Sequence, residues 1–229
     1  DLHSFPTRRS SDLAICTNLT TTPTLPATKL ANGCYSDMFT GCQSITAAPD
    51  LTAMELADLC YSNMFAGCTS LVTAPAILPA TTLTFGCYSS MFANCTSLTK
   101  APKLTATTLT STCYSNMFAG CTSLTTAPML PATSLNMYCY NAMFKNCTSL
   151  TIAPTLPATS LSINCYAGMF EGCLNLNTIK CLATNTSVIG CTTNWLKGVS
   201  STGNFTKAAS ATWANGDSGI PTGWTILNN

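Results

Sequence analysis

The chain has 229 residues, of which 46% are hydrophobic and only 7% are charged, and its formal net charge is +1. Ordinary domains carry about 25% charged residues, so we expect a surface built from Thr, Ser, Asn and Ala. This near-neutral charge gives no electrostatic basis for binding nucleic acid. No apolar run reaches the roughly 20 residues of a membrane-spanning helix.

Residues 1–13 stand apart from the rest of the chain. Their sequence, D-L-H-S-F-P-T-R-R-S-S-D-L, resembles a translated sequencing adapter of the kind that contaminates some metagenomic assemblies. The alternative is a genuine, disordered N-terminal tail. We leave the segment out of fold reasoning and expect that the native N-terminus, with any signal peptide, has been lost at this junction.

Histidine and arginine occur only in that segment, as His3, Arg8 and Arg9. Without histidine, residues 14–229 hold neither a Ser-His-Asp or Cys-His site nor an imidazole-ligated zinc. The carboxylates fall at unrelated positions of the pattern described below, so no pair suggests acid–base chemistry. We therefore expect a protein that is not an enzyme and has no catalytic, metal-binding or cofactor-binding residues. The six carboxylates after residue 13 are Asp37, Asp50, Glu55, Asp58, Glu171 and Asp217.

One block, C-Y-x-x-M-F-x-(G/N)-C-T-S-L-T-x-A-P-x-L-P-A-T-x-L, recurs six times. Its first cysteines are spaced by 26, 27, 26, 26 and 26 residues, a period typical of a solenoid in which each coil buries its apolar face against the next. We predict an α/β repeat solenoid over residues 14–197, right-handed, with six matched coils and degenerate ends. The first cysteines are Cys34, Cys60, Cys87, Cys113, Cys139 and Cys165.

The coil that starts at residue 113 illustrates the elements we expect. Residues 114–119 are good helix formers and precede Gly120, which predicts a short helical or 3₁₀ turn that ends there. The L-x-x-A segment at 124–127 suits a short parallel strand with Leu and Ala facing inward. Pro128 should then mark where the strand ends or bulges. One extra residue at 75–78 predicts a small bulge in the third coil.

These motifs resemble the BspA-like leucine-rich repeat family of bacterial surface proteins. The resemblance covers residues 14–191 and rests on Leu-x-x-(small)-Pro-x-Leu-Pro, followed by a segment that ends in Gly-Cys-Thr-Ser-Leu. This chain departs from the commonest family pattern in coils about three residues longer and in Ala-Pro where aliphatic residues are usual. The resemblance implies a leucine-rich-repeat fold, a cell-surface or secreted location, and a role in adhesion or interaction.

Fifteen cysteines raise the question of disulfides. The two cysteines of one coil, such as Cys113 and Cys121, would lie ~12 Å apart across a helical turn, beyond the ~7 Å limit for a bridge. Equivalent cysteines of neighbouring coils would lie ~5 Å apart, so disulfides between coils are geometrically possible. We favour buried, reduced thiols that fill the core, and C-x₇-C lacks the close pairs of zinc sites. The tyrosine after each first cysteine is either core or a surface ladder.

Cys191 begins a degenerate seventh coil, with Trp195 and Leu196 in place of Met-Phe. Residues 198–229 are rich in Gly, Ser and Thr and include Trp213 and Trp224. We expect a C-terminal cap in which Trp packs over the last coil. The alternative is a flexible linker to another domain.

Function is expected at the outward positions of the strand segments. The leading hypothesis is a non-catalytic protein that binds a protein or glycan partner through this face, and the alternative is a structural spacer that presents another domain. A minor alternative is an ice-binding Thr array, but Ala47, Val72, Lys100 and Ile152 interrupt its files. The candidate binding residues are Thr46, Asp50, Thr73, Lys100, Lys103, Thr126, Met129 and Ile152.

Overall fold

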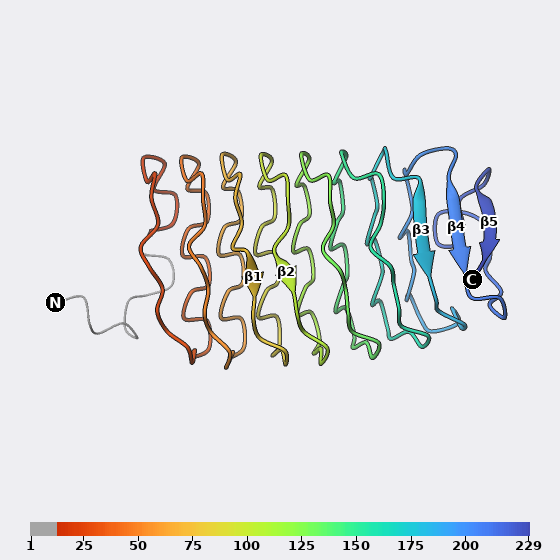
Figure 1. The fold of residues 1–229 in the computed structure, drawn as a ribbon, viewed down its shortest axis with the longest axis horizontal. Coiled ribbons are helices and arrows are strands. Elements are labelled where there is room, and N and C mark those ends of the chain that lie inside the picture. The colour runs from red at the N-terminus through yellow and green to blue at the C-terminus, as the bar shows by residue number, and fades with distance from the viewer. Residues whose placement is uncertain (1–12) are drawn as a thin grey trace.

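The computed structural model describes residues 13–229, and in it successive repeats form a stack of coils lying side by side (Figure 1). The predicted non-native or disordered tail, residues 1–13, lies outside the described residues except for Leu13. Leu13 itself packs against the core. Parallel pairs such as Leu25 with Leu51 and Ala47 with Thr73 join neighbouring coils. The predicted repeat of parallel segments is confirmed.

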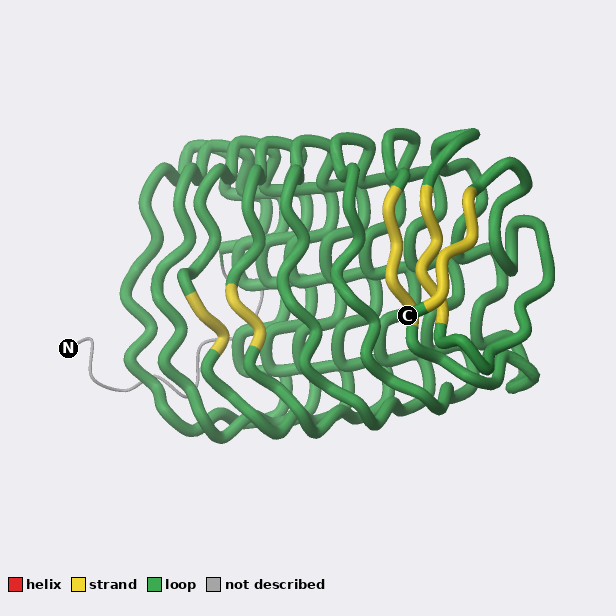
Figure 2. Tube along the Cα trace, turned by 45° about the vertical axis from the view of Figure 1, so that its right-hand side comes forward, coloured by secondary structure: helices red, strands yellow, loops and turns green. Residues whose placement is uncertain are grey.

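The regular strands are short and all pair in parallel. β1 (Ile77–Leu78) pairs with β2 (Lys103–Leu104). At the other end β3 (Thr178–Cys181), β4 (Asn204–Lys207) and β5 (Thr225–Asn228) form a sheet in the order β3-β4-β5. Isolated bridges continue the same wall between these two sheets (Figure 2).

The prediction of helical or 3₁₀ turns is wrong, because residues 13–229 contain no helix. The segment expected to be helical is instead a series of overlapping β-turns on the wall opposite the strands. Every fourth residue there has a positive φ, for example Thr112 (57°), Asn116 (55°) and Gly120 (76°). A right-handed helix cannot contain such residues.

Hydrogen bonding between coils explains why this wall is not helical. Backbone N–H groups alternate between two kinds of acceptor: Asn116 donates to the carbonyl of Asn141 in the next coil (2.8 Å), whereas Met117 donates to Tyr114, three residues back (3.2 Å). A helix would use all its N–H groups internally and leave neighbouring coils unpaired. The turn series satisfies its own backbone and joins the stack.

Two aromatic ladders fill the core between the walls. Tyr88 stacks on Tyr114 with ring centroids 5.7 Å apart, and Phe92 stacks on Phe118 at 5.7 Å with the rings 2° from parallel. The six repeat tyrosines are all buried, which confirms their core position and excludes the surface ladder. These aromatic residues are Tyr35, Tyr61, Tyr88, Tyr114, Tyr140 and Tyr166, with Phe39, Phe65, Phe92, Phe118, Phe144 and Phe170.

Thirteen of the fifteen cysteines are buried, and all fifteen are free thiols. From the second repeat to the sixth, the second cysteine donates its S–H to the carbonyl of a phenylalanine in the preceding coil, as from Cys121 to Phe92 (3.1 Å) and from Cys147 to Phe118 (3.1 Å). In the first repeat Cys42 donates to the carbonyl of Leu13 instead (3.0 Å). Burial raises the pKa of the Cys121 thiol to about 12. Their expected role as buried core residues is confirmed, and the thiol hydrogen bond adds a reason for cysteine at this position.

Residues 198–229 continue the stack and pack on its last coil. The indole of Trp213 stacks on Trp195 with centroids 5.2 Å apart and meets the edge of Phe205. Trp195 donates its Nε1–H to the carbonyl of Gly219 (2.9 Å). Trp224 is also buried, so apolar contacts hold this segment to the coils.

Candidate functional site

The eight candidate residues belong to the segments of the wall that contains the strands, which are yellow in Figure 2, and all eight are exposed. We call their exposed surface the strand face. It is formed by Thr46, Asp50, Thr73, Lys100, Lys103, Thr126, Met129 and Ile152.

The parallel register aligns most of these residues in two rows that run along the stack, one residue from each coil, and we call these rows files. Lys100 pairs with Thr73 on one side and with Thr126 on the other, and Ile152 pairs with Thr178. Such partners lie about 4.7–4.9 Å apart in the backbone. The first file therefore places hydroxyl, ammonium and apolar groups of successive coils next to each other.

The second file contains Lys103, whose neighbour in the third coil depends on the extra residue of that coil. β1 pairs Ile77 with Lys103 and Leu78 with Leu104. The extra residue of the third coil is accommodated before Ile77, and Lys103 donates its backbone N–H to the carbonyl of Ala76 (3.0 Å). Counting back from the buried Leu78 would have identified Ile77.

Thr46 and Asp50 lie towards the N-terminal end of the strand face. The carbonyl of Thr46 accepts the backbone N–H groups of Val72 (2.9 Å) and Thr73 (3.2 Å), which ties it to the first file. Asp50 instead lines a separate depression of about 390 Å³, together with Thr24 and Pro49. The strand face thus has a central part around the lysines and an acidic end.

The two lysines are the main charges of the central part. Neither Lys100 nor Lys103 forms an ion pair among the described residues, where the lysines that do so are Lys29 and Lys145. Their ammonium groups are therefore available to a partner. Because exposed pairs contribute little on their own, any affinity they add must come with nearby contacts.

Apolar side chains beside the lysines supply such contacts. Met129 is 75% exposed and Ile152 is 60% exposed, and Val72 and Ile77 are exposed on the same wall. The repeat tyrosines and phenylalanines are buried in the core and contribute nothing here. The arrangement can bind an acidic surface that also carries apolar groups, and it holds no pair of groups suited to acid–base catalysis.

A second polar array was missed by the sequence analysis. Where each coil turns after a buried alanine, exposed threonines follow one another over five coils without interruption, and Thr107 donates its backbone N–H to the carbonyl of Thr81 (3.1 Å). The signal was present in the Ala-Thr pair of each of these coils, which follows proline in three of the five. We call this array the threonine edge, and it consists of Thr81, Thr107, Thr133, Thr159 and Thr184 with the exposed Thr82, Thr108, Ser134, Ser160 and Asn185.

Comparison with models of protein families, with curated proteins and with solved structures found no match. Among residues 13–229, no group of three or more His, Cys, Asp or Glu side chains is placed to hold a metal ion. No helix in this part of the chain is long and apolar enough to cross a membrane.

Proposed function

We propose that this chain is a non-catalytic, leucine-rich-repeat type solenoid of the bacterial cell surface or of a secreted protein, and that it binds a protein or glycan partner through the strand face. The resemblance to BspA-like repeats supports the class and the location. The observation that carries the binding role is the register that aligns Thr73, Lys100 and Thr126 on an exposed, extended wall. Solenoids use such walls to bind extended partners.

The composition of the strand face supports this proposal. Its two unpaired lysines stand out in a chain with only 7% charged residues, and exposed Met129 and Ile152 flank them. Apolar groups beside complementary charge are typical of interaction surfaces. The partner that fits best presents carboxylate or sulfate groups next to apolar surface.

An array screen of glycans and extracellular-matrix proteins tests the proposal. The variant Lys100→Ala/Lys103→Ala should lose most of the saturable binding that the unmodified chain shows. The matched control Lys29→Ala/Lys197→Ala removes the same charge elsewhere and should bind normally. Binding that both variants weaken equally would indicate a general charge effect and would contradict a role for the strand face.

The threonine edge favours a second candidate function, the ordering of water or ice. Its five threonines are exposed, uncharged and regularly spaced, whereas Ala47, Lys100 and Ile152 interrupt the files of the strand face. Regular hydroxyl and methyl groups on a rigid stack are the chemistry that an ice surface would contact. Thermal hysteresis that the variant Thr107→Lys/Thr133→Lys abolishes would support it, and absence of hysteresis in the unmodified chain would reject it.

The structural spacer is the remaining alternative. It requires that a folded chain show neither saturable binding on the array nor thermal hysteresis. In that case the stack would serve only to hold another domain at a distance, and both surface variants would be functionally neutral.

A further inference from the structure

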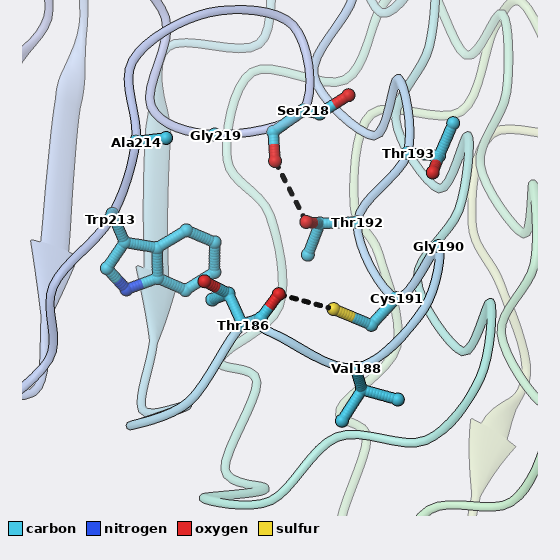
Figure 3. Close-up of a pocket in the computed structure, with 10 residues that line it drawn as sticks. All are labelled: Thr186, Val188, Gly190, Cys191, Thr192, Thr193, Trp213, Ala214, Ser218 and Gly219. Carbon is cyan, nitrogen blue, oxygen red and sulfur yellow. Dashed lines mark hydrogen bonds between the residues drawn. The ribbon is translucent and has the colours of Figure 1, made fainter.

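The C-terminal end of the stack contains a pocket that none of the repeats shares. It has a volume of about 230 Å³ and lies between two loops, one of which includes Thr186 and Cys191 and the other Trp213 and Ser218 (Figure 3). Ligand pockets for drug-sized molecules measure roughly 300–1,000 Å³. This pocket is therefore suited to one small ring or to the end of a chain.

An aromatic ring forms one wall of the pocket. Trp213 directs its six-membered ring towards Thr186 and Thr192 (Figure 3). Its position is fixed because its indole stacks on Trp195 at 5.2 Å and contacts Phe205 edge-on. Whereas the repeat tyrosines and phenylalanines are buried in the core, Trp213 is only partly buried and offers apolar surface to a ligand.

Hydrogen bonds fix the two loops and leave groups free for a ligand. Thr192 donates its hydroxyl to the carbonyl of Ser218 in the other loop (2.8 Å), and within the first loop Cys191 donates its S–H to the carbonyl of Thr186 (3.3 Å). The Ser218 hydroxyl oxygen accepts the backbone N–H of Asn194 (2.9 Å), so its own hydrogen remains a donor. Thr193 adds an exposed hydroxyl.

The lining also carries no charged side chain. A carboxylate or ammonium group that entered would lose hydration without gaining an ionic partner, which disfavours charged ligands. A neutral molecule with several hydroxyl groups would exchange hydrogen bonds with Thr193 and Ser218 instead. Its apolar C–H face could pack against Trp213.

We infer that this pocket binds a neutral sugar ring, such as the terminal residue of a glycan chain. The aromatic wall, the free hydroxyls, the absence of charge and the small volume each match that class of ligand. The inference does not depend on the strand face, because the two surfaces share no residues. A failure of either proposal leaves the other intact.

Saturation-transfer NMR on the full chain with glucose, galactose, mannose and N-acetylglucosamine tests the inference. At least one sugar should give saturable binding, and charged glucuronate should bind more weakly. The variant Thr186→Val/Thr193→Val removes two lining hydroxyls at nearly constant shape and should weaken binding about tenfold. The matched control Thr107→Val/Thr133→Val makes the same change on the threonine edge and should bind like the unmodified chain.

Substitutions of Trp213 test the aromatic wall separately. Trp213→Phe should fold normally, because the indole Nε1–H is buried without a partner and its removal breaks no hydrogen bond. It should retain part of the affinity, whereas Trp213→Leu should abolish it. If circular dichroism shows that Trp213→Leu is unfolded, the variant Thr186→Val/Thr193→Val alone tests whether the pocket binds the sugar. Lack of binding to all four sugars by a folded chain, or equal binding by the pocket and control variants, would overturn the inference.

Discussion

Raising the pH should unfold this protein through its buried thiols. Burial raises the pKa of seven cysteines to about 12, whereas an exposed thiol ionises near 8.5. Between these values the unfolded chain releases protons that the folded chain retains, so the free energy of unfolding falls as pH rises. The stability from these thiols is fully present below about pH 8.5 and is lost towards pH 12. The seven are Cys68, Cys87, Cys121, Cys139, Cys165, Cys173 and Cys181.

The size of this effect follows from the number of thiols. Each contributes a slope of about 1.4 kcal/mol per pH unit once its unfolded form is ionised, and seven together give about 10 kcal/mol per unit. Domains are stable by roughly 5–15 kcal/mol. We therefore expect cooperative unfolding within about one to two pH units above pH 9. Buried tyrosines act in the same direction, since burial raises the pKa of Tyr114 well above its ordinary value.

A pH titration in the presence of a reductant provides the assay. Circular dichroism, thiolate absorbance and tyrosinate absorbance should change together in one step, and return to neutral pH should restore the fold. Gradual thiol and tyrosine ionisation near the ordinary pKa values, with the circular dichroism unchanged, would refute the reasoning. It would show that these groups are not protected by the core.

Three substitutions test the turn wall, each by urea denaturation. Gly120→Ala should lower the free energy of unfolding by about 1–2 kcal/mol, because φ of Gly120 is 76°. The added methyl would also meet the Asn94 amide, so the second substitution Asn94→Gly should recover part of this loss. Additive effects of the two substitutions would contradict that contact. Thr112→Asn should stabilise by about 0.5–1 kcal/mol because Asn tolerates its positive φ better, and an unchanged midpoint would argue against strain there. Cys121→Ala should lower the free energy of unfolding by about 1–2 kcal/mol, because it removes the S–H hydrogen bond and leaves a small void. Cys16→Ala, at a half-buried site, should change the free energy of unfolding little. Equal effects of the two substitutions would contradict a role for the buried thiol hydrogen bond.

The repeat and its core could be predicted from the sequence, but the local structure of the turn wall could not. Cys113-Tyr114 and Met117-Phe118 are buried, whereas three of the four residues that follow these pairs are half-buried and Ser115 is buried. Inward pairs four residues apart also fit one side of a 3.6-residue helix, so the apolar pattern alone is ambiguous. The signal that separates the two structures is Asn116, four residues before Gly120. Residues that tolerate positive φ at a period of four favour turns over a helix.

The exposure of the candidate binding residues could be predicted from the sequence, but the pairing between residues of neighbouring coils could not. All eight residues of the strand face are exposed as expected, because their apolar neighbours along the strand define the inward side. The extra residue of the third coil places Ile77, and not Ala76, beside Lys103, which only the observed pairing reveals. The pocket at Trp213 could not be predicted, because it depends on two loops outside the repeat.

Lysine footprinting by mass spectrometry tests the central claim most directly. A partner identified on the array is added to the full chain, and acylation of each lysine is compared with and without it. Protection of Lys100 and Lys103, with Lys29, Lys145 and Lys197 modified as before, is the result that binding at the strand face predicts. Saturable binding that leaves Lys100 and Lys103 fully reactive would contradict it.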